Sequence, residues 1–225
     1  MTVKSAVEKI ETQGGEAVTG DFIFIEKPAY DLFKRIFDIF FSLTALIITS
    51  IPLLIFMFIT YMYDKGNPVF TQERVGKNGK LIKVYKLRTM IVSAEERRKT
   101  ERRDKEGRLL YYKEDNDPRV TPFGHFLRRT SADELLQFID ILRGDMSVIG
   151  PRPLIPSEHE EICKYVKRDL VKPGLSCYAA IYAKSKKSYD DYILHDFEYL
   201  QKRSVLTDID VLIKTVWVLL VHRNF

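Results

Sequence analysis

The sequence has few cysteines and lacks the common motifs for binding phosphates or metal ions. Its 225 residues contain two cysteines, which are too few for a disulfide framework and are typical of reduced thiols in a cytosolic compartment. A Walker loop, a GxGxxG fingerprint and a CxxC pair are missing, and the four histidines show no metal-ligand spacing. These absences exclude the P-loop, dinucleotide-binding and zinc-finger classes.

We expect no cleavable signal peptide in this sequence, and its charge is unevenly spread. The first 20 residues contain no apolar segment of the kind that a signal peptide needs. Residues 1–26 carry a net charge of −3, and because the total is +5, the remainder carries +8. A basic body favours anionic partners such as lipid headgroups or nucleotides. Nucleic acid is disfavoured because basic motifs interleaved with aromatic residues are missing.

One long segment, residues 39–63, has no charged side chain. As a helix its 25 residues would measure about 37 Å, which is enough to cross a bilayer core. Pro52 lies near its middle and, inside a helix, would leave the carbonyl of Ile48 without its usual donor. We expect a kink or a full turnaround between Thr49 and Pro52, with the hydroxyls of Thr49 and Ser50 close enough to compensate.

Basic residues flank this segment on both sides, with Lys34 and Arg35 before it and Lys65 after it. The positive-inside rule therefore assigns neither end to the far side of a membrane. A re-entrant helix with both ends on the cytoplasmic side satisfies the rule, and a spanning helix with a proline kink is the alternative. A buried helix of a soluble domain fits less well, because 25 uncharged residues exceed what one core usually hides.

A β-hairpin is predicted after the apolar segment. Asn78-Gly79 separates two moderately alternating runs, which indicates strands near 69–75 and 81–87. Three basic residues lie along the second run: Lys83, Lys86 and Arg88. They form either a nucleotide-facing row or the solvent-exposed side of the strand. Near the C-terminus, residues 208–222 have a broad apolar face that suits a membrane-interface helix and a core helix equally.

Two adjacent carboxylates, Asp133 and Glu134, follow closely after Arg128 and Arg129. Ser131-Ala-Asp-Glu134 matches a capping box, so a purely structural role at a helix start is one interpretation. The other is chemical: a carboxylate at a helix start stays ionised and can act as a nucleophile, while the arginines neutralise an incoming phosphate.

A second candidate phosphate site is Gly150-Pro151-Arg152-Pro153. The two prolines restrict the backbone on both sides of one cation, which suits a rigidly displayed phosphate ligand. An incidental arginine in a surface turn is the alternative interpretation.

These motifs, together with others in the same order, resemble the bacterial monotopic phosphoglycosyl transferases, the polyprenyl-phosphate sugar-1-phosphate transferases. The matching residues are Lys34-Arg35-Ile-Phe-Asp38, Pro52, Pro68-Val-Phe-Thr-Gln72-Glu-Arg74-Val-Gly76, Tyr85-Lys86-Leu-Arg88-Thr89-Met90, Asp117-Pro-Arg119-Val-Thr121, Gly124, Leu127-Arg128, Asp133-Glu134-Leu-Leu-Gln137, Arg143-Gly-Asp-Met-Ser147, Gly150-Pro-Arg-Pro153, Pro173-Gly174 and Asp208. They cover nearly the whole chain from residue 34 onward.

The resemblance implies a reaction and its participants. Asp133 would attack the sugar-bearing phosphorus of a UDP-sugar, UMP would leave, and a polyprenol (undecaprenyl) phosphate would take the sugar phosphate from the aspartate. This step starts the assembly of a polysaccharide or lipopolysaccharide. Mg²⁺ would bind near Asp133 and Glu134. The implied substrate-binding residues are Lys86, Arg88, Arg128, Arg152 and Lys184.

Lys184 enters through a departure from the family pattern. Where the family usually reads Pro-Gly-Ile-Thr-Gly-Trp-Ala-Gln-Val-Asn-Gly-Arg, this chain reads Pro173-Gly-Leu-Ser-Cys-Tyr-Ala-Ala-Ile-Tyr-Ala-Lys184, so the lysine replaces the arginine. The changed segment supports an alternative function, a membrane-anchored scaffold of a glycan assembly complex without activity.

The predicted fold is α+β and predominantly helical. It comprises a flexible tail over residues 1–33, a re-entrant membrane helix over residues 34–65 broken at Pro52, and a catalytic domain over residues 66–225. The small β-hairpin and interfacial amphipathic helices belong to that domain. The expected location is the cytoplasmic face of the bacterial inner membrane. The sequence is compatible with a homo-oligomer and does not determine the oligomeric state.

Overall fold

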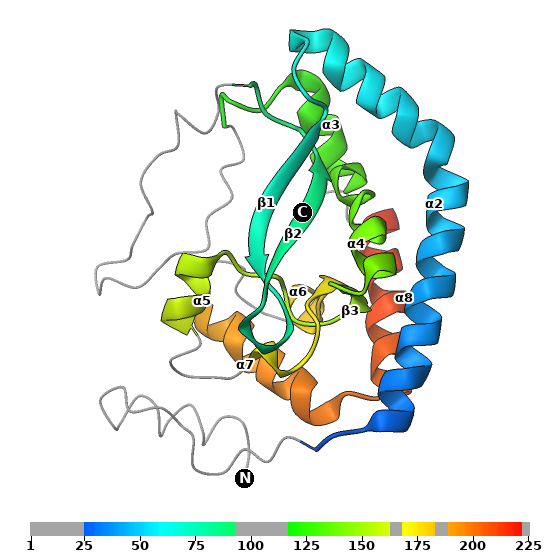
Figure 1. Cartoon of the computed structure of the whole chain (residues 1–225), viewed down its shortest axis with the longest axis vertical. Helices are drawn as coiled ribbons and strands as arrows, with labels where there is room; N and C mark the ends of the chain where they lie inside the picture. Colours follow the sequence, from blue (N-terminus) through cyan, green and yellow to red (C-terminus); the bar gives the residue numbers. More distant parts are fainter. Residues whose placement is uncertain (1–24, 93–116, 163–167, 183–188, 222–225) are drawn as a thin grey trace.

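The computed structural model describes residues 25–92, 117–162, 168–182 and 189–221 (Figure 1). Its elements are α2 (Pro28–Asp64), β1 (Val69–Val75), η1 (Lys77–Gly79), β2 (Leu81–Leu87), α3 (Pro122–Arg129), η2 (Ala132–Glu134), α4 (Gln137–Arg143), β3 (Ser147–Ile149), α5 (Pro156–Ile162), η3 (Arg168–Leu170), β4 (Gly174–Ser176), α6 (Tyr178–Tyr182), α7 (Tyr189–Lys202) and α8 (Val205–Val221). Within these residues the fold is mostly helical with two small two-stranded sheets, which confirms the predicted class. Cys177 is a buried free thiol, and Cys163 lies outside the described residues.

The β-hairpin has the bounds that the sequence predicts. β1 and β2 pair antiparallel, with Val75 opposite Leu81 next to the turn. Asn78 and Gly79 both have positive φ, 58° and 77°, a conformation that asparagine and glycine adopt at the lowest cost. Ile82, Val84 and Leu87 of β2 are buried in the core, and Lys83 stays exposed.

The apolar segment forms one continuous helix, α2, that begins at Pro28, ahead of the expected start at residue 34. Pro28 lies in the first turn, where its missing N–H has no helical partner to lose. Pro52 lies inside the helix, which continues through it, so of the two expectations the kink is met and the full turnaround is not (Figure 1). Figure 1 shows a bend near the middle of α2 and no turnaround.

The hydroxyls of Thr49 and Ser50 bind carbonyls other than that of Ile48, the carbonyl that the proline leaves without its helical donor. Thr49 Oγ1 donates to the carbonyl of Ala45 at 2.7 Å, and Ser50 Oγ donates to the carbonyl of Ile47 at 2.8 Å. The carbonyls of Ala45 and Ile47 keep their helical N–H donors, so these bonds do not replace the one lost at Ile48. Hydroxyl bonds to a preceding turn often accompany a bend in a helix.

Packing on both sides of Pro52 explains why α2 continues as one helix. The half before it packs Phe37 and Phe41 against a core cluster that includes Val84 and Ile141. The half after it adds Leu53 to a second cluster with Leu87, Leu127, Ala132 and Leu136. Both halves of α2 therefore lie against one body, and a turnaround would leave one of them without this contact.

Polar contacts fix α2 to that body at both ends. Asp38 is 2% exposed and accepts hydrogen bonds from the Val148 N–H at 2.9 Å and the Ser147 hydroxyl at 3.1 Å. At the far end, the Asp64 carboxylate accepts two hydrogen bonds of 2.6 Å from the Arg88 guanidinium.

The outer face of α2 is apolar and exposed. The helix is long and apolar enough to cross a membrane, and only 11% of its most apolar 18-residue window is buried. Exposed apolar residues on this face include Phe33, Ile36, Phe40, Leu43, Ile47, Ile51, Leu54 and Phe58. α8, which lies beside α2 in Figure 1, buries Val211 and exposes a second apolar set: Leu206, Ile213, Trp217 and Leu220.

Candidate active site

The carboxylate pair lies in a tight turn between α3 and α4. Ser131 adopts a left-handed conformation, with φ 55° and ψ 18°, and its side chain makes no capping hydrogen bond. Asp133 and Glu134 belong to the short 3₁₀ helix η2, and α4 begins only at Gln137. The predicted capping box is therefore wrong, because Ser131 turns the chain sharply to bury Ala132 in the second core cluster.

Lys86 from β2 meets this turn. Its ammonium group lies 2.5 Å from the Glu134 carboxylate, and both side chains are about one-third exposed. The structure thus brings together two residues that are 48 positions apart in the sequence. Because water screens such a pair, its value lies in placing a cation beside the two carboxylates more than in stability.

Arg128, the last but one residue of α3, supplies a second cation. Its Nε donates to the Thr89 hydroxyl at 3.0 Å. Burial lowers the pKa of the Arg128 guanidinium, and the carboxylates of Asp133 and Asp117 act against this shift. Arg128 therefore stays charged and lies close enough to Asp133 for the two charges to interact.

A set of contacts that the sequence did not reveal holds Arg128 in place. Thr121 caps α3, because its hydroxyl accepts from the Gly124 N–H at 2.9 Å, and its own N–H donates to the Thr89 carbonyl. Gly124 packs directly on Thr89, where a Cβ would approach the carbonyl oxygen to 2.0 Å. The start of α3 is therefore fixed to the segment that follows β2.

Asp117 and Arg119 form a charged pair next to this contact. The Arg119 guanidinium donates to both oxygens of the Asp117 carboxylate, at 2.9 and 2.5 Å. These hydrogen bonds lower the pKa of Asp117 to about 2. Asp117 is therefore an anion at any physiological pH, and it adds to the negative charge that faces Arg128.

Arg88, another predicted substrate ligand, has its contacts elsewhere. The Arg88 guanidinium donates to Asp64, to the Asn67 carbonyl at 2.6 Å and to the Met90 carbonyl at 3.0 Å. Arg88 thus joins the end of α2 to β2, and substrate binding by Arg88 stays a prediction. Lys184 lies outside the described residues.

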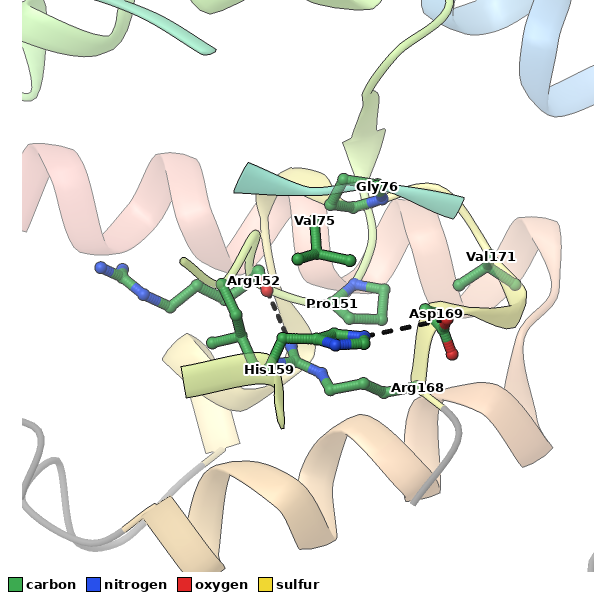
Figure 2. Close-up of a pocket in the computed structure, with 10 residues that line it drawn as sticks. Val75, Gly76, Pro151, Arg152, His159, Arg168, Asp169 and Val171 are labelled. Carbon is green, nitrogen blue, oxygen red and sulfur yellow. Dashed lines mark hydrogen bonds and ion pairs between the residues drawn. The ribbon is translucent and has the colours of Figure 1, made fainter. Parts of the chain in front are cut away.

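Arg152 follows β3 at the other end of the hairpin. Its neighbours contact β1 near the turn, since the Leu154 carbonyl accepts from the Val75 N–H at 2.8 Å. Figure 2 shows the Arg152 side chain pointing away from a small cavity, while its carbonyl accepts from Arg168 Nη2 at 2.8 Å. The cavity, which His159 also lines, holds about 20 Å³, enough for one water molecule.

Asp140 on α4 is a buried carboxylate that the sequence did not single out. It is fully buried, its Oδ2 accepts from the Tyr85 N–H at 3.0 Å, and its Oδ1 has no hydrogen-bond partner among the described residues. This bond gives a partner to the Tyr85 N–H, which lies on the outer edge of β2 one residue before Lys86. Burial raises the pKa of Asp140 to about 6.

The carboxylate pair suits a magnesium ion that is shared with a substrate. Among the described residues no group of three or more His, Cys, Asp or Glu side chains forms a complete cation site. Mg²⁺ in phosphate-handling enzymes usually binds one or two carboxylates and takes its other ligands from substrate phosphates and water. Asp133 and Glu134, half-exposed in η2, fit this partial set.

Comparison with known proteins gives the family. The model of the bacterial sugar transferase family matches residues 29–222, so the chain belongs to that family. It is 36% identical over 201 residues to the undecaprenyl-phosphate galactose phosphotransferase of Salmonella typhimurium. It is 35% identical over 207 residues to the UDP-glucose:undecaprenyl-phosphate glucose-1-phosphate transferase of Escherichia coli K12.

A third relative is the UDP-N-acetylgalactosamine-undecaprenyl-phosphate N-acetylgalactosaminephosphotransferase of Aeromonas hydrophila, 32% identical over 200 residues. The matches cover 87%, 84% and 85% of this chain. They cover 42%, 42% and 44% of the three relatives, so the chain spans less than half of their length.

The ionisation of Asp140 predicts an unusual dependence of stability on pH. The folded pKa of about 6 exceeds the ordinary value of 3.8, so the folded state binds the proton more tightly and loses stability as the pH rises from about 4 to 6. Asp140→Asn removes the buried charge. We expect the variant to be more stable than the parent at pH 8, by about 1–2 kcal/mol, and to lack this pH dependence.

Thermal unfolding in a neutral detergent between pH 5 and pH 8 measures this difference. Glu73→Gln, an exposed charge on β1, is the matched control and should follow the parent at every pH. An Asp140→Asn protein that is equally destabilised at pH 5 and pH 8 would show that the ionised carboxylate is required for the fold.

Proposed function

We propose that this chain transfers a sugar phosphate from a UDP-sugar to a polyprenol phosphate through a covalent intermediate on Asp133. The observation that carries the proposal is the η2 turn, where two adjacent carboxylates lie beside Lys86 and Arg128. Membership of the bacterial sugar transferase family supports the same reaction class.

In the first step, an oxygen of Asp133 attacks the phosphorus that carries the sugar. A new aspartyl O–P bond forms, the O–P bond to the UMP phosphate breaks, and UMP leaves with the bonding electrons. In the second step, an oxygen of the polyprenol phosphate attacks the same phosphorus, which gives a polyprenol diphosphate sugar and restores the carboxylate. Splitting the transfer into two displacements is the advantage of a covalent nucleophile.

The surrounding cations address the main electrostatic obstacle. A carboxylate that approaches a diphosphate meets repulsion between like charges, and fixed cations reduce it. Arg128 interacts with Asp133 and is held by Thr89, and Lys86 is paired with Glu134. Bound Mg²⁺ would neutralise further charge on the diphosphate, with Asp133 and Glu134 as its protein ligands.

The names of the relatives suggest the acceptor and leave the sugar open. All three act on undecaprenyl phosphate, whereas the sugars named are galactose, glucose and N-acetylgalactosamine. We therefore assign undecaprenyl phosphate as the acceptor and a UDP-sugar as the donor. A panel of UDP-sugars is the appropriate substrate set, and the reaction would begin the assembly of a glycan or polysaccharide.

The contacts of α2 support a re-entrant placement in the membrane. Asp38 contacts β3, and Asp64 contacts Arg88 at the end of β2, so both flanks of the apolar run hold polar contacts to the same domain. A helix that spans a bilayer would separate these two contacts by the hydrocarbon core. Because UDP-sugars are cytosolic, we place the domain and both flanks on the cytoplasmic face of the inner membrane.

Replacing the nucleophile tests the reaction. Asp133→Asn keeps the size of the side chain but cannot form the aspartyl phosphate, so UMP release should fall by at least about a thousandfold. The assay measures UMP from a panel of UDP-sugars with undecaprenyl phosphate and Mg²⁺. Asp210→Asn, an equivalent change on the exposed side of α8, should keep parental turnover.

Ordinary turnover by a folded Asp133→Asn protein would sink the assignment of the nucleophile. A parent that releases no UMP from any sugar in the panel would favour the inactive scaffold instead.

Cysteine labelling tests the topology. Single cysteines at Glu26 and Asn67, both exposed, are placed in a background without Cys163 and Cys177. In intact cells an impermeant thiol reagent should label neither position and a permeant reagent should label both, with a periplasmic cysteine protein as the positive control. Impermeant labelling at one position alone would establish a spanning helix.

A further inference from the structure

Three cations gather around Gly144, away from the carboxylate pair. Gly144 ends α4 with φ 89°, and a Cβ at this position would lie 3.4 Å from Lys172 Nζ and 3.5 Å from Arg35 Nη2. The two nitrogens therefore lie within about 7 Å of each other, and the space that a Cβ of Gly144 would take between them is called the notch. Lys77, in the hairpin turn, is the third cation of the group.

Arg35 is fixed in this position by the backbone. Its two terminal nitrogens donate to the carbonyls of Ile141 and Leu142, at 2.6 and 2.7 Å, and so satisfy the C-terminal end of α4. A cation is favourable at a helix C-terminus. Arg35 thus presents a fixed positive charge to the notch without any carboxylate as its partner in these bonds.

Lys172 has no such compensation. It is half-buried, and no ion pair or hydrogen bond of its ammonium group occurs among the described residues. Burial lowers the pKa of Lys172, and the positive charges of Arg35 and Lys77 lower it further, with Asp38 and Asp145 only partly opposing them. A half-buried cation between two others costs stability, so an anion from outside the chain is the group that this arrangement lacks.

The two nearby carboxylates are engaged elsewhere. Asp38 accepts from Ser147 and Val148. Asp145 lies 4.0 Å from Lys80 and 3.7 Å from Arg143, which adds two more cations to the same region. The neighbourhood of the notch is therefore net positive.

The position of Arg35 along α2 indicates which anion is present there. Arg35 precedes Ile39, the first residue of the uncharged run, by four residues, which is about 6 Å along a helix axis. If the apolar run enters the bilayer, as the proposed function requires, Arg35 lies at the depth of the lipid phosphates. Phe33 and Ile36, exposed on the outer face of the same turns, would lie against the lipid.

We propose that Lys172 and Arg35, with Lys77 at the rim, bind the phosphate of an anionic membrane phospholipid. The notch lies at the C-terminal end of α4, whereas η2, with Asp133 and Glu134, precedes the N-terminal end. The bound lipid is therefore a ligand that holds the domain against the membrane and is separate from the acceptor attacked in the reaction. Clusters of basic residues at a membrane surface attract anionic lipids.

Flotation with lipid vesicles tests the proposal. Lys172→Met keeps most of the side-chain volume and removes the charge. Its binding to vesicles of phosphatidylcholine with 30% phosphatidylglycerol should fall at least threefold, and its binding to pure phosphatidylcholine should not change. Lys202→Met, an exposed lysine of α7, is the matched control and should bind both kinds of vesicle like the parent.

Two further measurements separate a binding role from a structural one. In neutral detergent, Lys172→Met should unfold at the same temperature as the parent or a higher one, because the change relieves repulsion. Lys77→Met, an exposed change in the hairpin turn, should also weaken binding to the anionic vesicles, by about twofold. An unfolded Lys172→Met protein together with unchanged binding by Lys77→Met would overturn the proposal.

Other outcomes also overturn it. Equal losses in Lys172→Met and Lys202→Met would show a general charge effect without a site. A loss seen only with phosphatidylcholine vesicles that contain undecaprenyl phosphate would assign the notch to the acceptor. Vesicle binding needs no turnover, so a parent that floats with the anionic vesicles but releases no UMP would refute the proposed reaction and leave this site intact.

Discussion

The buried carboxylate of Asp38 is the contact on which the arrangement of the molecule depends. It directly precedes the uncharged run of α2, is 2% exposed, and accepts hydrogen bonds from the backbone and a side chain of β3. Hydrogen bonds to a charged group stabilise the folded state by about 1.5–3 kcal/mol each, and an unpaired buried charge destabilises it by more. These two effects together favour a single position of α2 against the domain. Arg35, one turn earlier on α2, donates to the carbonyls at the C-terminal end of α4 and so holds the two helices together.

A series of contacts connects Asp38 and Arg35 of α2 to the carboxylate pair. α4, held by Arg35, carries Asp140, which binds the edge of β2 at Tyr85. The next residue of β2, Lys86, then meets Glu134. On the other side of Pro52, Leu53 packs in the cluster that buries Ala132, the residue before Asp133. The apolar helix and the candidate active site are thus parts of one packed unit, which suits an enzyme whose acceptor is a membrane lipid.

Local chemistry explains which parts of the fold could be predicted from the sequence. Asn78-Gly79 specifies its own turn, and the hairpin strands have the predicted bounds. Pro52 predicted a kink, but whether a helix bends or turns back depends on what each half packs against. Ser131 read as a cap, yet burial of Ala132 imposes a left-handed turn there.

The roles of Arg88 and Asp140 depend on contacts between segments that are distant in the sequence, so the sequence alone does not indicate them. Arg88 follows Lys86 in the basic row, but its guanidinium donates to the carboxylate of Asp64, 24 residues away. The spacing of residues in the sequence cannot indicate this contact. Asp140 looks like a surface residue of an amphipathic helix, and only the edge of β2 explains its burial. The motif of Asp133 and Glu134 is local and visible in the sequence. The basic row on the second strand includes Lys86, but only the tertiary structure shows that Lys86 pairs with Glu134, 48 positions away.

Mass spectrometry of the intact protein shows directly whether Asp133 carries the sugar phosphate covalently, as we propose. The purified protein is incubated with Mg²⁺ and a UDP-sugar that supports turnover, in the absence of acceptor, and then quenched. The account predicts a mass increase of one sugar phosphate that maps to the peptide containing Asp133 and disappears when undecaprenyl phosphate is added. Turnover without any adduct, or an adduct on another residue, would contradict it.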